Sequence, residues 1–277
     1  SRQAPSAWLN HLPQFQDTLD QLFPVTPAGF TYQPFLEAFD IPSFQGVQEE
    51  AVQAIITRKN PLILMPTGGG KSLCYQLPAL MYYRRQWGLT VCISPLQALM
   101  EDQVADLEAK GLDFATYINS TLPAELRAER LEALRNGHKG LLYISPEQLR
   151  SISIRSLLRE HPPALWVIDE AHCISQWGQS FRPDYRYIPK FIQELYTDLN
   201  RPMPPLALLT ATATAQVRDD ICQLFKQQSL PISSQITASL QRDNLNFQVV
   251  PVKGNKDPLV VKLVQRALDQ GGCALVY

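Results

Sequence analysis

This 277-residue sequence lacks long apolar runs, paired cysteines and an excess of either charge. No apolar stretch approaches the roughly 20 residues that a membrane helix needs, and the first ten residues lack the layout of a signal peptide. The five cysteines include no C-x-x-C pair, so no zinc site can be recognised, and their scatter suits buried thiols in a reducing compartment. We therefore expect an intracellular protein without a membrane partner, cytoplasmic in a bacterium or nuclear in a eukaryote.

The charge balance excludes a global basic field. The chain has 25 Lys and Arg against 26 Asp and Glu, a formal net charge of -1. Any contact with nucleic acid must therefore use a local patch or residues outside this chain. Hydrophobic residues make up 45% and charged residues 18%, which predicts a sizeable core and one large α/β domain, or one and a half smaller ones.

Apolar periodicity predicts the fold class. After residues 1–43, expected to form a helical extension of short helices and turns, continuous apolar runs alternate with amphipathic ones. The predicted strands are 61–65, 89–93, 114–118, 140–144, 165–168 and 206–209, and the predicted helices are 48–56, 72–85, 98–110, 124–136, 188–199 and 215–225. Continuous apolar strands are typical of sheets buried on both faces. The sequence therefore predicts an α/β fold, a mainly parallel sheet flanked by helices, with ligands at the carboxyl ends of the strands.

The last part of the chain predicts a domain boundary. Two further strands are expected at 232–237 and 246–252, then a linker at 253–258, a helix at 260–268 and a new apolar run at 273–277. We expect one domain over 44–252, and in 253–277 a linker and the start of a truncated second domain.

A glycine-rich turn lies between a predicted strand and a predicted helix. It reads Met65-Pro66-Thr67-Gly68-Gly69-Gly70-Lys71-Ser72. Glycines let backbone N–H groups turn toward phosphate oxygens, and the positive end of the following helix points to the same place. Lys71 can reach the β- and γ-phosphates, and the Ser72 hydroxyl can hold Mg²⁺. Met65 stands where the general pattern has glycine. The predicted nucleotide ligands are Thr67, Gly68, Gly69, Gly70, Lys71 and Ser72.

Two adjacent carboxylates follow the predicted strand 165–168. Asp169 can hold the Mg²⁺ shell, and Glu170 can orient the attacking water or accept its proton. Phosphoryl transfer needs this pairing, because the metal neutralises developing charge while the base positions the nucleophile. Together with Lys71, the two acids predict a site that hydrolyses a nucleoside triphosphate.

These residues carry a family resemblance. Asp169-Glu170-Ala171-His172 and its continuation to Tyr185 resemble the DEAH box and aromatic-rich loop of RecQ helicases, and 65–77 (MPTGGGKSLCYQL) resembles their motif I. The match covers roughly residues 39–252 in the right order. It implies a RecA-like P-loop NTPase domain, the N-terminal motor lobe of a superfamily 2 DNA helicase. Such a protein uses ATP and Mg²⁺ to move 3′-to-5′ along single-stranded DNA and unwind duplexes and junctions, in repair and recombination. A second RecA-like lobe in the same protein is also implied.

The resemblance assigns further roles by position. Phe39 and Gln48 resemble the motif that reads adenine. The positions that resemble DNA-side and coupling motifs are Ser94, Pro95, Gln103, Asn119, Ser145, Thr210 and Thr212. Taken singly, the Ser, Thr and Asn residues fit ordinary turn and cap chemistry equally well. The chain has Gln45, Glu101 and Gln148 where basic residues are common, which indicates a DNA contact unlike that of the typical member.

Three aromatic residues recur every four positions after the acid pair: Trp177, Phe181 and Tyr185. This spacing also makes one apolar helix face, so plain packing remains open. Gly178 and Pro183 interrupt a helix and favour a loop. Aromatic side chains on such a loop can stack on unpaired bases, each worth ~1–3 kcal/mol.

The resemblance gives this loop a signalling role. It implies that the loop, with Arg182 among its aromatics, senses single-stranded DNA. His172 and Gln176 beside the acids would relay that contact to the ATP site, and we count both with Lys71, Asp169 and Glu170 as catalytic candidates.

Two other functions remain open. The same lobe could serve a nucleic-acid-stimulated ATPase that remodels RNA or protein–DNA complexes without strand separation, although the long aromatic loop favours DNA. It could also be a non-catalytic module that keeps ATP as a structural ligand, which the intact Lys71, Asp169 and Glu170 argue against.

Overall fold

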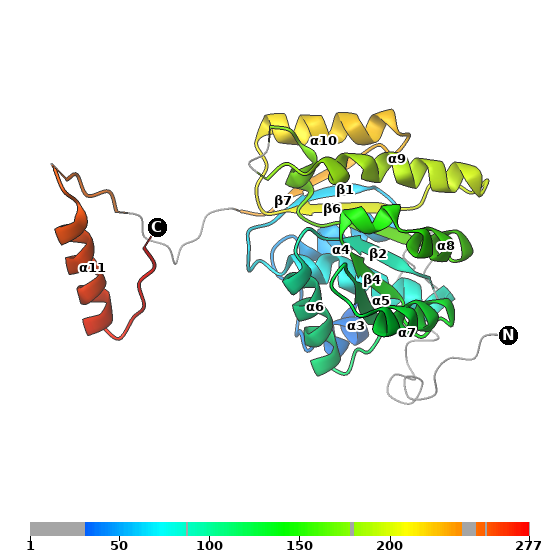
Figure 1. The fold of residues 1–277 in the computed structure, drawn as a ribbon, viewed down its shortest axis with the longest axis horizontal. Helices are drawn as coiled ribbons and strands as arrows, with labels where there is room; N and C mark the ends of the chain where they lie inside the picture. Colours follow the sequence, from blue (N-terminus) through cyan, green and yellow to red (C-terminus); the bar gives the residue numbers. More distant parts are fainter. Residues whose placement is uncertain (1–30, 87, 178–179, 240–247, 253, 277) are drawn as a thin grey trace. The chain divides into compact units, whose positions relative to one another are not determined.

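The computed structural model describes residues 31–86, 88–177, 180–239, 248–252 and 254–276 (Figure 1). Most of the predicted extension 1–43 lies outside these residues, as do Gly178 and the first two residues of the predicted strand 246–252. The chain divides into two compact units between Leu240 and Gln241. Each unit is described separately.

The first unit is built on a seven-stranded sheet in the order β3-β4-β2-β5-β6-β1-β7, in which every paired strand is parallel. The strands are β1 (Pro61–Leu64), β2 (Thr90–Ile93), β3 (Ala115–Ile118), β4 (Leu141–Ile144), β5 (Leu165–Ile168), β6 (Leu206–Thr210) and β7 (Ser234–Thr237). Each coincides with a predicted apolar run to within two residues. The predicted fold class, a mainly parallel sheet flanked by helices, is confirmed.

Helices connect the strands and cover both faces of the sheet (Figure 1). Their bounds are α3 (Gln33–Ala38), α4 (Gln48–Ile56), α5 (Lys71–Gln86), α6 (Gln97–Ala109), α7 (Ala124–Arg135), η1 (Pro146–Arg150), α8 (Ile152–Glu160), η2 (Ala171–Ile174), α9 (Pro183–Asp198) and α10 (Ala215–Gln227). Helix α8 was not predicted, and α9 starts five residues earlier than expected. Pro183 was expected to interrupt a helix, but it occupies the first turn, where the missing N–H costs nothing.

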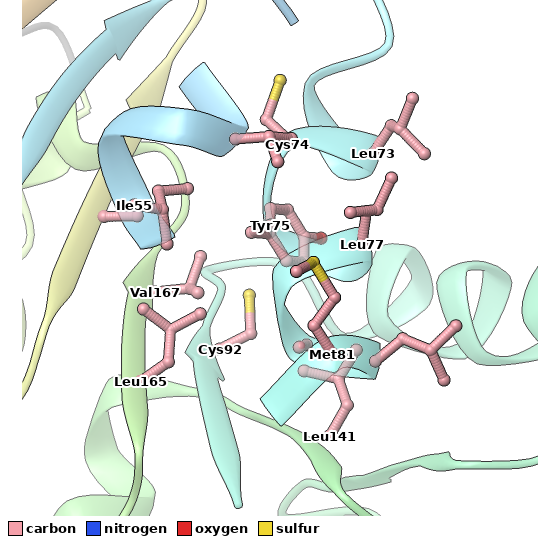
Figure 2. Close-up of a cluster of buried hydrophobic side chains, with 14 of the residues drawn as sticks. Ile55, Leu73, Cys74, Tyr75, Leu77, Met81, Cys92, Leu141, Leu165 and Val167 are labelled. Atoms are coloured by element: carbon pink, nitrogen blue, oxygen red, sulfur yellow. The ribbon is translucent and has the colours of Figure 1, made fainter. Parts of the chain in front are cut away.

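The strands alternate between two hydrophobic clusters, one on each face. In β5, Leu165 and Val167 face a cluster with α3, α4, α5 and α6, while Trp166 and Ile168 face a cluster with α7, α8, α9 and α10. Figure 2 shows the first cluster, where Tyr75 and Met81 of α5 lie over Cys92 and Val167. Double-sided burial explains why the strands appear in the sequence as unbroken apolar runs.

A short polar network crosses the first cluster. Gln76 Nε2 donates to the Tyr143 hydroxyl and to Gln103 Oε1, both at 2.9 Å, and the Tyr75 and Tyr143 hydroxyls lie 3.4 Å apart. Buried polar groups are costly unless they are hydrogen-bonded. The network therefore orients the helix of the glycine-rich turn, α5, against β4 and α6.

The second unit contains helix α11 (Asp257–Asp269), none of whose residues is buried. It overlaps the predicted helix 260–268. The prediction of strands at 273–277 and 246–252 is wrong for the described residues, because 248–252 and 273–276 form no strand. A strand forms only where a neighbouring strand pairs with its N–H and C=O groups. No helix among the described residues is long and apolar enough to cross a membrane.

Gly140 provides a test of core packing. A Cβ at this position would lie 2.2 Å from Tyr83 Cδ2. The Tyr83 ring is fixed, because it stacks on Phe114 and its hydroxyl donates to the carbonyls of Gly137 and His138. Gly140→Ala should therefore lower the free energy of unfolding by about 1–3 kcal/mol, measured by urea denaturation.

The matched control is the same substitution in a Tyr83→Ala background. Alanine removes the two closest atoms, Cδ2 at 2.2 Å and Cγ at 2.3 Å, and keeps only Cβ at 2.7 Å, so Gly140→Ala should cost less there. Equal costs in the two backgrounds would contradict this account.

Candidate active site

The glycine-rich turn connects the end of β1 to the start of α5. Gly68 and Gly70 have φ of 78° and 73°, a conformation that glycine adopts without strain. A Cβ on Gly70 would also lie 2.3 Å from Gln48 Nε2. Met65 has no left-handed φ and its side chain is buried, so this position does not require the glycine of the general pattern. Lys71 Nζ donates to the Met65 carbonyl at 3.4 Å.

Gln48 holds this turn in place. Its side chain is buried, its Oε1 accepts from Gln45 N at 2.8 Å, and its Nε2 donates to the Gly70 carbonyl at 3.3 Å. The amide thus joins the start of α4 to the phosphate loop. Phe39 was predicted to contact the nucleotide. Its ring is 2% exposed and belongs to the core cluster with α3 and α4.

The acid pair lies directly after β5. Asp169 is buried, and its Oδ1 accepts from Glu170 N at 2.9 Å. Glu170 has φ 48° and ψ 47°, a left-handed conformation that is costly for a residue other than glycine. Strained residues of this kind cluster at functional sites.

Electrostatics connect the two acids to the phosphate loop. Burial raises the pKa of Asp169 to about 6, and the charge of Glu170 adds to this, while Lys71 and His172 oppose it. The hydrogen bond from His172 lowers the pKa of Glu170, and the charge of Lys71 lowers it further. The lysine of the loop therefore acts on both carboxylates. This relation was predicted from the order of the motifs.

His172 joins Glu170 to the end of β6. Its Nδ1 lies 3.2 Å from Glu170 Oε2 and 2.9 Å from Thr210 Oγ1, and the Thr210 hydroxyl donates to the Thr212 carbonyl at 3.0 Å. Contact with the Cys173 thiol, followed by the bond to Glu170, raises the pKa of His172 to about 9. Since Thr210 uses its proton on Thr212, its oxygen accepts from the imidazole N–H.

The oxygen donors near Lys71 suit Mg²⁺. Magnesium keeps several waters and takes one or two carboxylates together with substrate phosphates. Asp169 and the Ser72 hydroxyl provide hard oxygen donors of this kind. Among the described residues no group of three or more His, Cys, Asp and Glu could hold a metal, and a magnesium site of this type does not require one.

Several predicted DNA-side residues are buried. Ser94, Asn119 and Ser145 are each only 1–2% exposed. Asn119 Oδ1 accepts from Thr121 N and Leu122 N, both at 3.1 Å, and Ser145 Oγ donates to Glu147 at 2.5 Å. Asn119 and Ser145 thus stabilise their own loops, and none of the three side chains is exposed in this conformation. Gln103 is likewise hydrogen-bonded to Gln76, as described above.

The aromatic loop divides into an exposed part and a buried part. Trp177 is 68% exposed, and Arg182 Nη1 donates to the Pro95 carbonyl at 2.8 Å. Gln176 is also exposed, and Phe181 is partly so. Tyr185 was predicted to belong to the DNA-binding and coupling loop. Its ring is fully buried, and its hydroxyl donates to the Asp169 carbonyl at 3.1 Å. The open packing alternative therefore applies to Tyr185.

A cavity of about 470 Å³ lies between the aromatic loop and His172. It is lined by His172, Trp177, Ser180, Thr212, Ala213, Thr214 and Val217. Thr214, not among the predicted site residues, caps α10 by accepting from Val217 N at 3.3 Å. Leu96, which follows Pro95, is 52% exposed.

The parallel sheet, the glycine-rich loop and the acid pair define a P-loop nucleotide-binding domain of the RecA-like type. The family model of DEAD/DEAH box helicases matches residues 45–221, and the chain belongs to this family of ATP-hydrolysing enzymes. The resemblance to RecQ helicases is confirmed. ATP-dependent DNA helicase RecQ of Bacillus subtilis is 44% identical over 241 residues, covering 86% of this chain and 38% of the relative. ATP-dependent helicase SGS1 of Saccharomyces cerevisiae is 41% identical over 218 residues, which cover 77% of this chain and 14% of the relative.

Solved structures agree on the fold. The helicase MrfA bound to DNA and AMPPNP has a TM-score of 0.60 at 19% identity, covering 85% of this chain and 34% of that one. A hypothetical ATP-dependent RNA helicase from Sulfolobus tokodaii has a TM-score of 0.52 at 15% identity, and the match covers 80% of this chain and 57% of that one. These likenesses concern the fold alone. The chain spans less than two fifths of the length of the two curated relatives above.

Asp169 should make stability depend on pH. A folded-state pKa near 6 lies above the ordinary value of 3.8, so the metal-free protein loses stability as pH rises through this interval. Asp169→Asn removes the buried charge. The variant should melt several degrees above the parent at pH 8, because about 3 kcal/mol is the most that this shift can cost. The gain should vanish near pH 4.

Thermal melts of both proteins in chelator-treated buffer at pH 4.5, 6 and 8 check this prediction. A parent that remains as stable as the Asn variant at pH 8 would show that Asp169 is not desolvated.

Proposed function

We propose that this chain is the ATP-binding motor lobe of an ATP-dependent DNA helicase. In this proposal, Mg-ATP hydrolysis drives 3′-to-5′ movement on single-stranded DNA and duplex unwinding. The observation that carries it is that the charge of Lys71 lowers the pKa of both Asp169 and Glu170 at one sheet edge. Two relatives named as ATP-dependent DNA helicases support DNA as the substrate.

The phosphate loop would bind the triphosphate. The backbone amides around Thr67, Gly69 and Gly70, together with the positive end of α5, provide donors and a favourable field for phosphate oxygens. Lys71 would neutralise charge on the β- and γ-phosphates. Mg²⁺, held by Ser72 and Asp169, would supply further charge neutralisation. Gln48 keeps the loop in shape through the Gly70 carbonyl, next to the expected position of the adenine.

Glu170 would orient the attacking water. Its lowered pKa keeps the carboxylate ionised at neutral pH, so it can accept a hydrogen bond from water. His172 Nδ1 holds Glu170 Oε2 at 3.2 Å, and the backbone N–H of Ala211 is a second donor to the same carboxylate. The left-handed backbone at Glu170 sets its direction apart from that of its neighbour Asp169.

Coupling to DNA would run through His172. The hydrogen bond from the imidazole to Thr210 joins His172, and through it Glu170, to the 210–214 loop. The exposed Trp177 lines the cavity beside this loop. Arg182 joins the aromatic loop to Pro95 at the end of β2. A base stacked on Trp177 would therefore bias the position of Glu170. Gln176, exposed beside Trp177, would be the second relay.

Other parts of the proposal follow from the resemblance and from the relatives' greater length. A second RecA-like lobe in the same protein would complete the ATP site, with residues 44–252 as the first lobe and 253–277 leading toward the next. The protein would act inside the cell, in the bacterial cytoplasm or the eukaryotic nucleus.

Glu170→Gln tests the catalytic assignment. The substitution keeps the shape and removes the base, so ATP hydrolysis should fall about 100-fold or more while ATP binding persists. Phosphate release with and without single-stranded DNA measures the rate, and a fluorescent ATP analogue measures binding. A variant that hydrolyses ATP at the parental rate would overturn the proposal.

Thr210→Val separates coupling from chemistry. Valine keeps the volume and removes the oxygen that His172 contacts. We expect basal hydrolysis to change little, and the increase caused by DNA to shrink several-fold. Stimulation by RNA alone, or hydrolysis without unwinding of a 3′-tailed duplex when the second lobe is present, would favour the remodelling function instead.

A further inference from the structure

Three arginines on the side of the molecule that carries α7 bond carboxylates, in the pairs Arg135–Glu160, Arg150–Asp184 and Arg159–Asp198, at 2.8–3.0 Å. Arg130 and Arg155 instead donate to neutral acceptors, each next to its own helix. Arg127 contacts only neutral acceptors. Its Nη2 donates to Gln148 Oε1 at 2.9 Å and to Ser151 Oγ at 3.0 Å, and its Nη1 donates to the Asn119 carbonyl at 3.3 Å. Within the described residues Arg127 forms no ion pair.

These contacts join two loops at one sheet edge. Asn119 follows β3 directly, and Gln148 and Ser151 lie in and after η1, which follows β4. Because all paired strands are parallel, their carboxyl ends lie at the same edge as the phosphate loop and Asp169. Arg127 is therefore fixed on the edge where the proposed motor meets its substrates.

The guanidinium carries a positive charge that no ion pair neutralises in the described part of the chain. Partial burial lowers its pKa, but arginine remains protonated at any physiological pH. Two carboxylates contact these loops: Glu101 of α6 accepts from Asn119 Nδ2 at 3.3 Å, and Glu147 of η1 accepts from Ser145 Oγ. A phosphate would be repelled near these acids and attracted at Arg127. Because the chain has no excess of positive charge, one local cation can determine where a nucleic-acid backbone binds.

We propose that Arg127 forms a phosphate-contact site for the nucleic-acid backbone, where the 119–122 loop meets the 145–151 segment. This inference rests on the proposed function as a DNA motor. Gln148, Ser151 and Asn119 orient the planar fork, and its remaining N–H groups bond a phosphate oxygen. Such a contact sets the position of the strand and carries no base information.

Salt dependence of DNA binding tests the site. The affinity for a fluorescein-labelled single strand is measured by anisotropy at several salt concentrations, for the parent and Arg127→Gln. Loss of one phosphate contact should weaken binding equally for two unrelated sequences. The slope of log affinity against log salt should decrease in magnitude by about 0.7.

Arg130→Gln is the matched control. It makes the same charge change three residues along α7, but Arg130 Nη1 donates to the Tyr117 carbonyl at 2.7 Å and its guanidinium lies 3.9 Å from the Tyr117 ring. This variant should keep the parental slope. The exchange Arg127→Gln with Gln148→Arg returns a guanidinium to the same junction, so it should restore the slope.

A folded Arg127→Gln protein with the parental slope would overturn the site. Equal losses for Arg130→Gln would overturn it too, because the charge effect would then not be local. If Arg127→Gln does not fold, judged by circular dichroism, the exchange variant decides: a parental slope supports the site and a reduced slope contradicts it. A parent that binds no DNA would instead contradict the proposed function itself.

Discussion

The parallel arrangement of the strands is the constraint on which the site depends. Each strand of the sheet ends at the same edge, so whatever follows a strand is delivered to one surface. The glycine-rich loop follows β1, the acid pair follows β5, and Thr210 ends β6. Burial of both faces fixes the strands in register, because Leu165 and Val167 must face one cluster while Trp166 and Ile168 face the other. The same burial raises the pKa of Asp169, since its strand ends inside the core.

His172 gives this edge its connectivity. One ring nitrogen lies within bonding distance of Glu170 and of Thr210, so the acid that would orient water and the loop after β6 share a hydrogen-bonding group. The neighbouring cavity opens beside Trp177. A second hydrogen bond, from Gln76 of α5 to Gln103 of α6, joins the helix that follows the phosphate loop to its neighbour. Hydrogen-bonded groups of this kind have few alternative partners in a packed interior, which makes them suitable for transmitting a displacement.

The sequence predicted the strands well, because unbroken apolar runs such as 165–168 have few interpretations between amphipathic segments. It also grouped Lys71 with Asp169 and Glu170, and in the structure the charge of Lys71 lowers the pKa of both acids. The sequence did not predict in which direction the side chains point. Phe39, Ser94, Asn119, Ser145 and Tyr185 have the right residue types at the right positions, yet all are buried. Pro183 was ambiguous because proline ends a helix interior but starts a first turn equally well. Arg127 carries no motif, and only its contacts with two separate loops in three dimensions distinguish it.

The central claim is that one nucleotide lies against the loop around Gly69 with its metal ion facing Asp169. A crystal structure of the chain with Mg²⁺ and a non-hydrolysable ATP analogue measures this directly. The account predicts phosphate oxygens on the amides of residues 67–71, Lys71 Nζ beside the terminal phosphates, and the metal bound to Ser72 and, directly or through water, to Asp169. A nucleotide bound elsewhere, or a metal with no contact to either residue, would contradict it.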